Sequence, residues 1–305
     1  MLIGDCASDP PLGATARALA TMRSTDVLFG LGAAAVARGH RQLALAAADP
    51  PTRAALRRAL TDAAADVQLI EVPDAWPAVA AGARDELLPA SLLVAIADEA
   101  RGRRPSAFVT VAGAVAQPTV LACPPATTMA ELVARAGGAL EDDWLPIAGG
   151  APAGRLVARD ATVGDVGAPS LVLVLPARHG WVRRLRTPVG AWLWRAASAC
   201  EGCRHCSDAC PAALSPHALT ATLTRARDDG TAPAAFAACS GCGLCDAACP
   251  ASLSPRALSV AVRDRLHAGG VDGAAPVARA GLDRALLTLR LGLARYDVAP
   301  VVALA

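Results

Sequence analysis

Eight of the ten cysteines in this chain lie in two short clusters that share one spacing. The first cluster runs through Cys200, Cys203, Cys206 and Cys210, and the second through Cys239, Cys242, Cys245 and Cys249, each ending in Cys-Pro. Both read C-x2-C-x2-C-x3-C-P, the ligand run of bacterial ferredoxins that carry two clusters. This feature restricts the fold most, because the chain must wrap its loops around metal clusters.

The spacing also indicates which thiols share a cluster. Three cysteines, each separated from the next by two residues, can converge from one tight loop on three corners of a cubane. The fourth lies about one helical turn further on, and in two-cluster ferredoxins it ligates the other cluster. We therefore predict one [4Fe-4S] cluster on Cys200, Cys203, Cys206 and Cys249, and another on Cys239, Cys242, Cys245 and Cys210.

Zinc sites, a degenerate cluster site and a disulfide framework are the alternatives. Disulfide frameworks are typical of small secreted chains, whereas this chain has 305 residues. Zinc sites use paired C-x2-C units, but a third cysteine at the same spacing followed by Cys-Pro is not typical of them. We favour two [4Fe-4S] clusters, which imply a reducing, cytoplasmic compartment.

Two further cysteines, Cys6 and Cys123, stand alone among apolar or small residues. We expect both to be small buried hydrophobes, with a reactive or ligating role as the alternative.

Composition and charge narrow the class of partner. The chain has 29 basic and 27 acidic residues, a net charge of +2, and only 3% aromatic residues. Nucleic-acid-binding proteins usually show a basic stripe and aromatic rings for base stacking, so we expect no nucleic-acid partner. The apolar run at 87–97 is too short to span a bilayer, and the N-terminus lacks the features of a secretory signal. We therefore expect no transmembrane segment.

Residues 1–104 alternate between strand-like and helix-like patterns. Apolar runs at 41–47 and 67–72 predict short strands, and residues 51–65 between them predict a helix that Asp49 can cap. This alternation predicts a partly parallel sheet in a partial α/β, Rossmann-like domain.

Helical periodicity also covers residues 14–39, in two pieces. Ser24, Thr25 or Asp26 can cap the second piece. Inside it lies the run GLGAAA at 30–35, which matches the glycine fingerprint of dinucleotide-binding proteins. That fingerprint needs a strand-to-helix turn, and here it falls within a helix, so we expect its glycines to serve close helix packing.

Residues 105–177 change to the element order of a β-grasp domain. The predicted elements are a hairpin of strands at 107–116 and 119–122, a helix at 128–137 capped by Thr127 or Thr128, and a closing strand at 170–175.

Residues 178–268 form the predicted helical, two-cluster domain, and residues 269–305 a C-terminal helix and tail. Three of the five tryptophans lie in a linker and helix at 178–198, and we expect them to pack beside the clusters. The other predicted elements are helices at 254–267 and 280–293 and an apolar tail at 298–305.

This order of segments resembles the RnfC/PduS group of iron–sulfur oxidoreductases. The middle piece, VTVAGAV to GGAPAGRLV, is similar to their SLBB β-grasp domain, and the two cysteine motifs match their clusters. The closing RLGLARYD at 290–297 looks most like the cobalamin reductases of propanediol-utilising microcompartments. The resemblance implies a flavin-type α/β domain, a redox partner protein, and a microcompartment or a membrane complex as the setting.

One departure from that group concerns its flavin. Its members place a glycine-rich loop that cradles FMN and NADH upstream of the strand matched by residues 2–5, and the given sequence has no counterpart. The family's flavin- and NADH-binding residues therefore have no equivalents to carry over, and we expect no bound FMN. The eight cluster ligands carry over one by one.

We therefore predict an α+β multidomain protein: a truncated flavin-type α/β domain, an SLBB β-grasp domain and a helical two-[4Fe-4S] ferredoxin-like domain. Its predicted role is electron transfer as a subunit or partner of an oxidoreductase system, with no catalytic residue of its own. The alternatives are a complete flavin-dependent cobalamin reductase, and a ligand- or partner-binding SLBB module with structural clusters.

Overall fold

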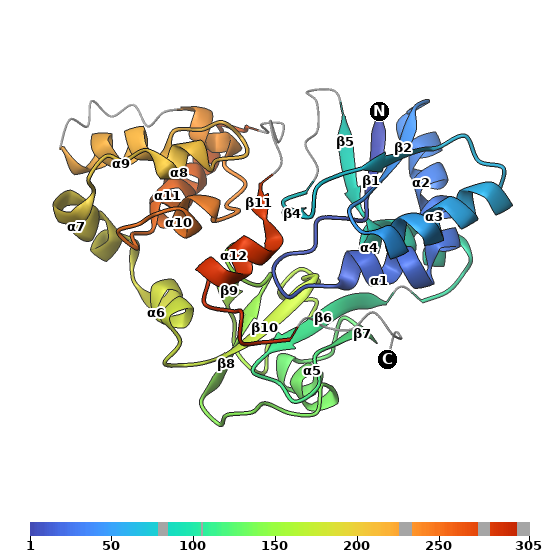
Figure 1. Cartoon of the computed structure of the whole chain (residues 1–305), viewed down its shortest axis with the longest axis horizontal. Coiled ribbons are helices and arrows are strands. Elements are labelled where there is room, and N and C mark those ends of the chain that lie inside the picture. Colours follow the sequence, from blue (N-terminus) through green and yellow to red (C-terminus); the bar gives the residue numbers. More distant parts are fainter. Residues whose placement is uncertain (79–84, 105, 226–233, 274–280, 298–305) are drawn as a thin grey trace.

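A computed structural model describes residues 1–78, 85–104, 106–225, 234–273 and 281–297. An N-terminal α/β layer, a second mixed sheet and a lobe of short helices follow one another along the chain (Figure 1). The last helix, α12, returns to lie between the helical lobe and the N-terminal layer (Figure 1). The predicted α+β multidomain fold is confirmed.

The N-terminal layer is a parallel sheet in the order β3-β2-β1-β5. Its strands are β1 (Leu2–Asp5), β2 (Leu43–Ala47), β3 (Gln68–Glu71) and β5 (Glu86–Pro89). The helices are α1 (Thr15–Met22), α2 (Ser24–Arg38), α3 (Pro50–Asp62) and α4 (Ala90–Ala100). One face of the sheet and the apolar faces of these helices form one core, and Ile3, Ala44 and Ala46 form a separate buried cluster on the other face. The predicted strand–helix–strand alternation is confirmed.

Helix α3 starts where the sequence predicts. The side chain of Asp49 accepts a hydrogen bond from the Thr52 backbone N–H at 2.9 Å, and proline occupies the first helical turn. Both features satisfy or remove backbone donors that no intrahelical carbonyl can pair.

Helix α2 starts differently from the prediction. Its N-cap is Arg23, with no side-chain cap, so the expectation of a cap from Ser24, Thr25 or Asp26 is wrong. The reason is that Asp26 is buried, and its carboxylate pairs with Arg23, Arg101 and Arg103.

The glycine fingerprint lies wholly inside α2, as expected. A Cβ placed on Gly30 would lie 1.9 Å from the backbone oxygen of Leu93 in α4, so only glycine fits at this helix crossing. Gly32 meets nothing within 4 Å, and the packing role expected for it is wrong.

The second sheet has the order β7-β6-β10-β8-β9 and the β-grasp arrangement. Its central strands β6 (Ala107–Gly113) and β10 (Leu171–Pro176) are parallel, and the other pairings are antiparallel. The remaining elements are β7 (Thr119–Cys123), α5 (Met129–Arg135), β8 (Trp144–Ala148) and β9 (Arg155–Leu156). Thr128 and Glu131 form a reciprocal capping box at the start of α5, which confirms the predicted cap.

The helical lobe begins with two helices, because Pro188 divides the predicted segment 178–198. They are α6 (Gly180–Arg186) and α7 (Val189–Ala199). The others are α8 (His205–Asp208), α9 (Pro216–Thr224), a 3-10 turn (Ala234–Ala238), α10 (Leu244–Ala247) and α11 (Pro255–Ala268). Trp181 and Trp192 are buried as expected, but Trp194 is 81% exposed, and the packing role expected for it is wrong.

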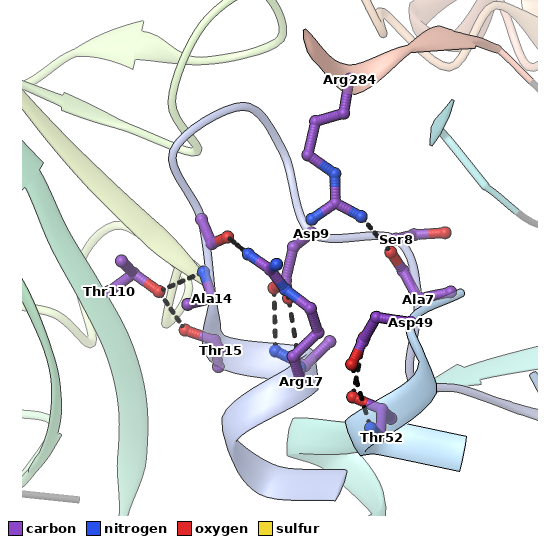
Figure 2. A network of polar contacts seen from close by, with 12 residues as sticks. Ala7, Ser8, Asp9, Ala14, Thr15, Arg17, Asp49, Thr52, Thr110 and Arg284 are labelled. Atoms are coloured by element: carbon purple, nitrogen blue, oxygen red, sulfur yellow. Dashed lines mark hydrogen bonds and ion pairs between the residues drawn. The ribbon is translucent and has the colours of Figure 1, made fainter. Parts of the chain in front are cut away.

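The C-terminal helix α12 (Arg284–Arg290) is shorter than the predicted 280–293. The chain before it forms strand β11 (Leu282–Asp283), which pairs with β4 (Ala75–Trp76). The buried Arg284 donates a hydrogen bond to the Ala7 carbonyl at 3.1 Å, which ties α12 to the N-terminal layer (Figure 2). The apolar tail predicted at 298–305 lies outside the described residues. None of the helices in the described ranges is long and apolar enough to cross a bilayer.

Candidate iron–sulfur centres

Both cysteine motifs adopt the same local backbone. Gly202 and Arg204 in the first motif have φ of 71° and 68°, and Gly241 and Gly243 in the second have 68° and 77°. These left-handed residues turn the chain sharply between successive thiols, which lets three side chains of one short loop face one region. A one-turn helix, α8 or α10, follows each loop.

The repeat continues beyond each motif. Cys210 begins CPAALSPHAL and Cys249 begins CPASLSPRAL, and the serine–proline pair starts α9 in the first copy and α11 in the second. In both copies the third residue after the last cysteine has φ of 53°. The cysteine spacing alone did not predict this extension, although the repeated residues indicate it.

The first centre is a cavity lined by Cys200, Cys203, Cys206 and Cys249. Counted with the solvent at its mouth, the empty volume is about 540 Å³. Its wall includes the apolar side chains of Trp192, Ala196 and Leu258. Three thiols of the first motif therefore meet the fourth thiol of the second.

The second centre is a smaller cavity of about 360 Å³, lined by Cys239, Cys242, Cys245 and Cys210. It again joins three thiols of one motif to the fourth of the other. Cys245 and Cys210 are buried, whereas Cys200 and Cys203 of the first centre are exposed. The two centres therefore differ in their access to solvent.

Burial raises the pKa of most of these thiols. The pKa of Cys206 rises to about 11, chiefly through burial and then through the neighbouring Cys249. Burial is also the largest cause of the raised pKa of Cys239, Cys242, Cys245 and Cys249. Thiols of this kind become thiolates only when a bound metal compensates the buried charge.

The donor set fits [4Fe-4S] clusters, because each cavity presents four cysteine thiols and such clusters take four thiolates. Within the described ranges, no group of three or more His, Cys, Asp or Glu side chains is placed to hold a single metal ion. The thiols line two cavities, as a cluster would require.

Asp246, next to Cys245, holds the second loop in place. Its carboxylate accepts hydrogen bonds from the Ser254 hydroxyl at 2.6 Å and the Arg256 backbone N–H at 2.7 Å, and pairs with Arg184 at 3.4 Å. The residue is 4% exposed, so these partners compensate a buried charge. It connects α10, α6 and the start of α11.

Two arginines of α11 also reach the second loop. Arg256 donates to the Gly241 carbonyl at 2.8 Å and to the Ala153 carbonyl of the β-grasp segment at 2.5 Å. Arg263 donates to the Cys239 carbonyl at 3.0 Å. The cysteine spacing predicted neither residue: Arg256 lies in the repeated run after Cys249, where the first copy has His217, and Arg263 lies beyond it.

The two isolated cysteines, Cys6 and Cys123, are buried, as expected for small hydrophobes. Burial also raises the pKa of both thiols.

A separate pocket lies beyond the carboxyl ends of β1 and β5, where the strand order of the parallel sheet reverses. Counted like the two centres, with the solvent at its mouth, its empty volume is about 330 Å³. Asp5, Asp9 and hydroxyl side chains line it, and none of its described lining residues is basic. Asp9 accepts hydrogen bonds from the backbone N–H groups of Ala16 and Arg17 at the start of α1 (Figure 2). A protein carboxylate thus occupies the donors that could otherwise hold a phosphate.

Two domain families match parts of the chain. An SLBB domain matches residues 108–155, and a 4Fe-4S dicluster domain matches residues 199–254. The chain therefore carries an SLBB domain and an iron–sulfur domain, which supports iron–sulfur electron transfer.

The chain matches only part of the length of its curated relatives. The chain is 31% identical over 226 residues to the cobalamin reductase PduS of Salmonella typhimurium, which is 65% of this chain and 48% of the relative. It is 38% identical over 113 residues to PduS of Citrobacter freundii, which is 37% of this chain and 25% of the relative. The chain thus spans half or less of these relatives, and the predicted similarity to PduS is confirmed.

Among solved structures, a chain of an NAD+-reducing [NiFe]-hydrogenase in the air-oxidised state is similar at 18% identity and a TM-score of 0.48. The match covers 94% of this chain and 59% of that chain.

Proposed function

We propose that this chain transfers electrons to or from a partner protein through two [4Fe-4S] clusters with crossed ligands. The first cluster would be held by Cys200, Cys203, Cys206 and Cys249, and the second by Cys239, Cys242, Cys245 and Cys210. The observation that carries the proposal is that each cavity collects three thiols of one motif and the fourth thiol of the other. When bound, each cluster supplies a centre that takes up and releases one electron.

The protein's own residues hold, shield and present these centres. Apolar walls limit water around the thiols, and protein charges and hydrogen bonds tune such centres. Because Cys200 and Cys203 are exposed, we propose that the first centre faces the redox partner. The more buried second centre would exchange electrons within the complex.

The other parts of the chain would then be structural or regulatory. We propose the boundaries 1–104, 105–177, 178–268 and 269–305 for the flavin-type, SLBB, two-cluster and C-terminal segments. Arg256 binds the SLBB segment to the second loop, so the β-grasp sheet supports that centre. We propose a reducing, cytoplasmic location, and association with a microcompartment or a membrane complex stays a prediction.

A complete cobalamin reductase is the second candidate, favoured by the 31% identity to PduS. That activity would need a flavin or another donor site. We propose instead that this chain holds no FMN, because Asp9 occupies the backbone donors at the start of α1 and the adjacent pocket is acidic. The role is then that of an electron-transfer subunit.

Anaerobic reconstitution tests the proposal. The protein should retain about eight iron and eight sulfide per chain, and dithionite should reduce the clusters reversibly. Cys123→Ala is the matched control, because Cys123 is far from both cysteine motifs in the sequence; this variant should retain the full complement of iron and sulfide. Retention of zinc in place of iron, or clusters that cannot be reduced reversibly, would contradict the proposal.

A further inference from the structure

We propose that a separate cavity beside the first centre, which we call the arginine cavity, binds a small ligand bearing phosphate groups. This arginine cavity is lined by residues of α6, α7, α10 and α12 and of the segments that flank them. Measured as the space open to the centre of a water molecule, and not with the solvent at its mouth as for the two centres, its volume is about 680 Å³, within the range of small-molecule pockets. Cys249 forms part of its wall, so the proposal of a first cluster places that cluster next to the ligand.

The charge of the arginine cavity is strongly positive. Arg183, Arg195 and Arg290 line it, are exposed, and form no ion pair with any described residue. A fourth arginine, Arg184, pairs with Asp246, which is the only acidic residue among the described lining. The cavity therefore keeps about three uncompensated positive charges, which an anion would neutralise.

Two tryptophan rings stiffen the wall of the arginine cavity. Trp181 is only 5% exposed, and its indole N–H is buried away from the open space, so the arginines are the donors that a ligand would meet. The guanidinium of Arg184 lies 5.1 Å from the Trp181 ring and 5.5 Å from the Trp192 ring, which fixes both rings in the wall.

The ligand is expected to be small and to carry phosphate. The three unpaired arginines come from three different helices and surround one hollow, whereas a docking face for an acidic protein would spread its charges over a surface. Guanidinium groups bind phosphate through two parallel hydrogen bonds, and several arginines suit a ligand with more than one phosphate oxygen.

Histidine protonation adds little to this charge near neutral pH. His179 also lines the cavity, and burial, followed by the charges of Arg295 and Arg183, lowers its pKa. It is therefore neutral at pH 7, and the arginines supply the positive charge.

Binding of inorganic pyrophosphate to the anaerobically purified holoprotein is the direct test. Titration calorimetry, with tryptophan fluorescence as a second readout, should show saturable binding that weakens as salt is raised. Arg183→Gln together with Arg290→Gln should weaken binding by about tenfold or more, since each charge-assisted bond contributes to affinity.

Arg265→Gln is the matched control, because Arg265 is exposed on α11 and does not line the cavity. It should bind pyrophosphate like the unaltered protein. No saturable binding, or equal loss in the Arg265 variant, would overturn the proposal. Tighter binding of a polyglutamate peptide than of pyrophosphate would overturn it in favour of an acidic protein partner. Cluster content, measured on every variant, shows separately whether the proposed clusters are present.

Discussion

Substituting alanine for each of two glycines in the same helix should change the stability of the protein in opposite directions. Gly30 and Gly32 both lie inside α2, where alanine is favoured over glycine by about 1 kcal/mol. A Cβ at Gly32 meets nothing within 4 Å, so Gly32→Ala should retain this gain. A Cβ at Gly30 would lie 1.9 Å from the Leu93 carbonyl oxygen and 2.6 Å from its carbon, whereas contacts under 3.0 Å essentially do not occur.

The loss of stability in Gly30→Ala depends on which atoms must move to make room for the new Cβ. The clashing atoms are backbone, so α2 and α4 must separate and lose part of their packed interface. Overpacking costs about 1–3 kcal/mol, and because the clashing atoms are backbone we take the upper end, about 3 kcal/mol. After the helix-propensity gain of about 1 kcal/mol, we expect a net loss of about 2 kcal/mol. At about 2–4 °C per kcal/mol for a chain of this size, Gly30→Ala should lower Tm by about 4–8 °C, and Gly32→Ala should raise it by about 2–4 °C.

Thermal unfolding followed by far-ultraviolet circular dichroism, under anaerobic conditions and at one heating rate, measures both shifts. Hydrogen exchange of the α4 amides should become faster in Gly30→Ala and stay unchanged or slow in Gly32→Ala. If both substitutions raise Tm equally, the close approach of α2 to α4 is refuted as the reason for Gly30.

Three further outcomes are expected. The folded state lowers the pKa of His179 below its usual 6.5, so the folded state favours the neutral ring. The stability that the neutral ring contributes is present above about pH 6.5 and is lost as pH falls through the lowered pKa. His179→Asn should therefore reduce the fall in Tm between pH 7 and 5.5. Arg256→Ala, which removes the bonds to the Gly241 and Ala153 carbonyls, should speed chelator-driven iron loss from the second centre by up to about tenfold, whereas Arg265→Ala should leave the rate unchanged. Protein incubated with excess FMN and then desalted should show no flavin absorbance, and stoichiometric flavin would restore the complete-reductase interpretation.

Local signals in the sequence predicted much of the fold. The caps at Asp49 and Thr128 involve partners within three residues, so their letters alone indicate where α3 and α5 begin. Apolar runs bounded by turns predicted β2, β3, β6, β7 and β10, whereas β5, β8 and β9 were not predicted. The cysteine spacing indicated the thiols that the two cavities bring together.

Long-range contacts explain what the sequence did not predict. Asp26 does not cap α2 because Arg101 and Arg103, about 75 residues away, take its carboxylate. Gly30 and Gly32 look equivalent in the sequence, and only the position of α4 distinguishes them. The arginine cavity joins residues more than a hundred positions apart, such as Arg183 and Arg290, and no local pattern indicates that they meet.

The crossed ligation of the two clusters is tested most directly by the EPR spectrum of reduced Cys249→Ser protein. Cys203→Ser and Cys242→Ser give the reference spectra, because each removes a thiol from the loop of one motif. We predict that Cys249→Ser resembles Cys203→Ser, with the first cluster altered and the second intact, since Cys249 lines the cavity of the first motif. A spectrum that matches Cys242→Ser would mean that Cys249 serves its own motif, and would contradict the account.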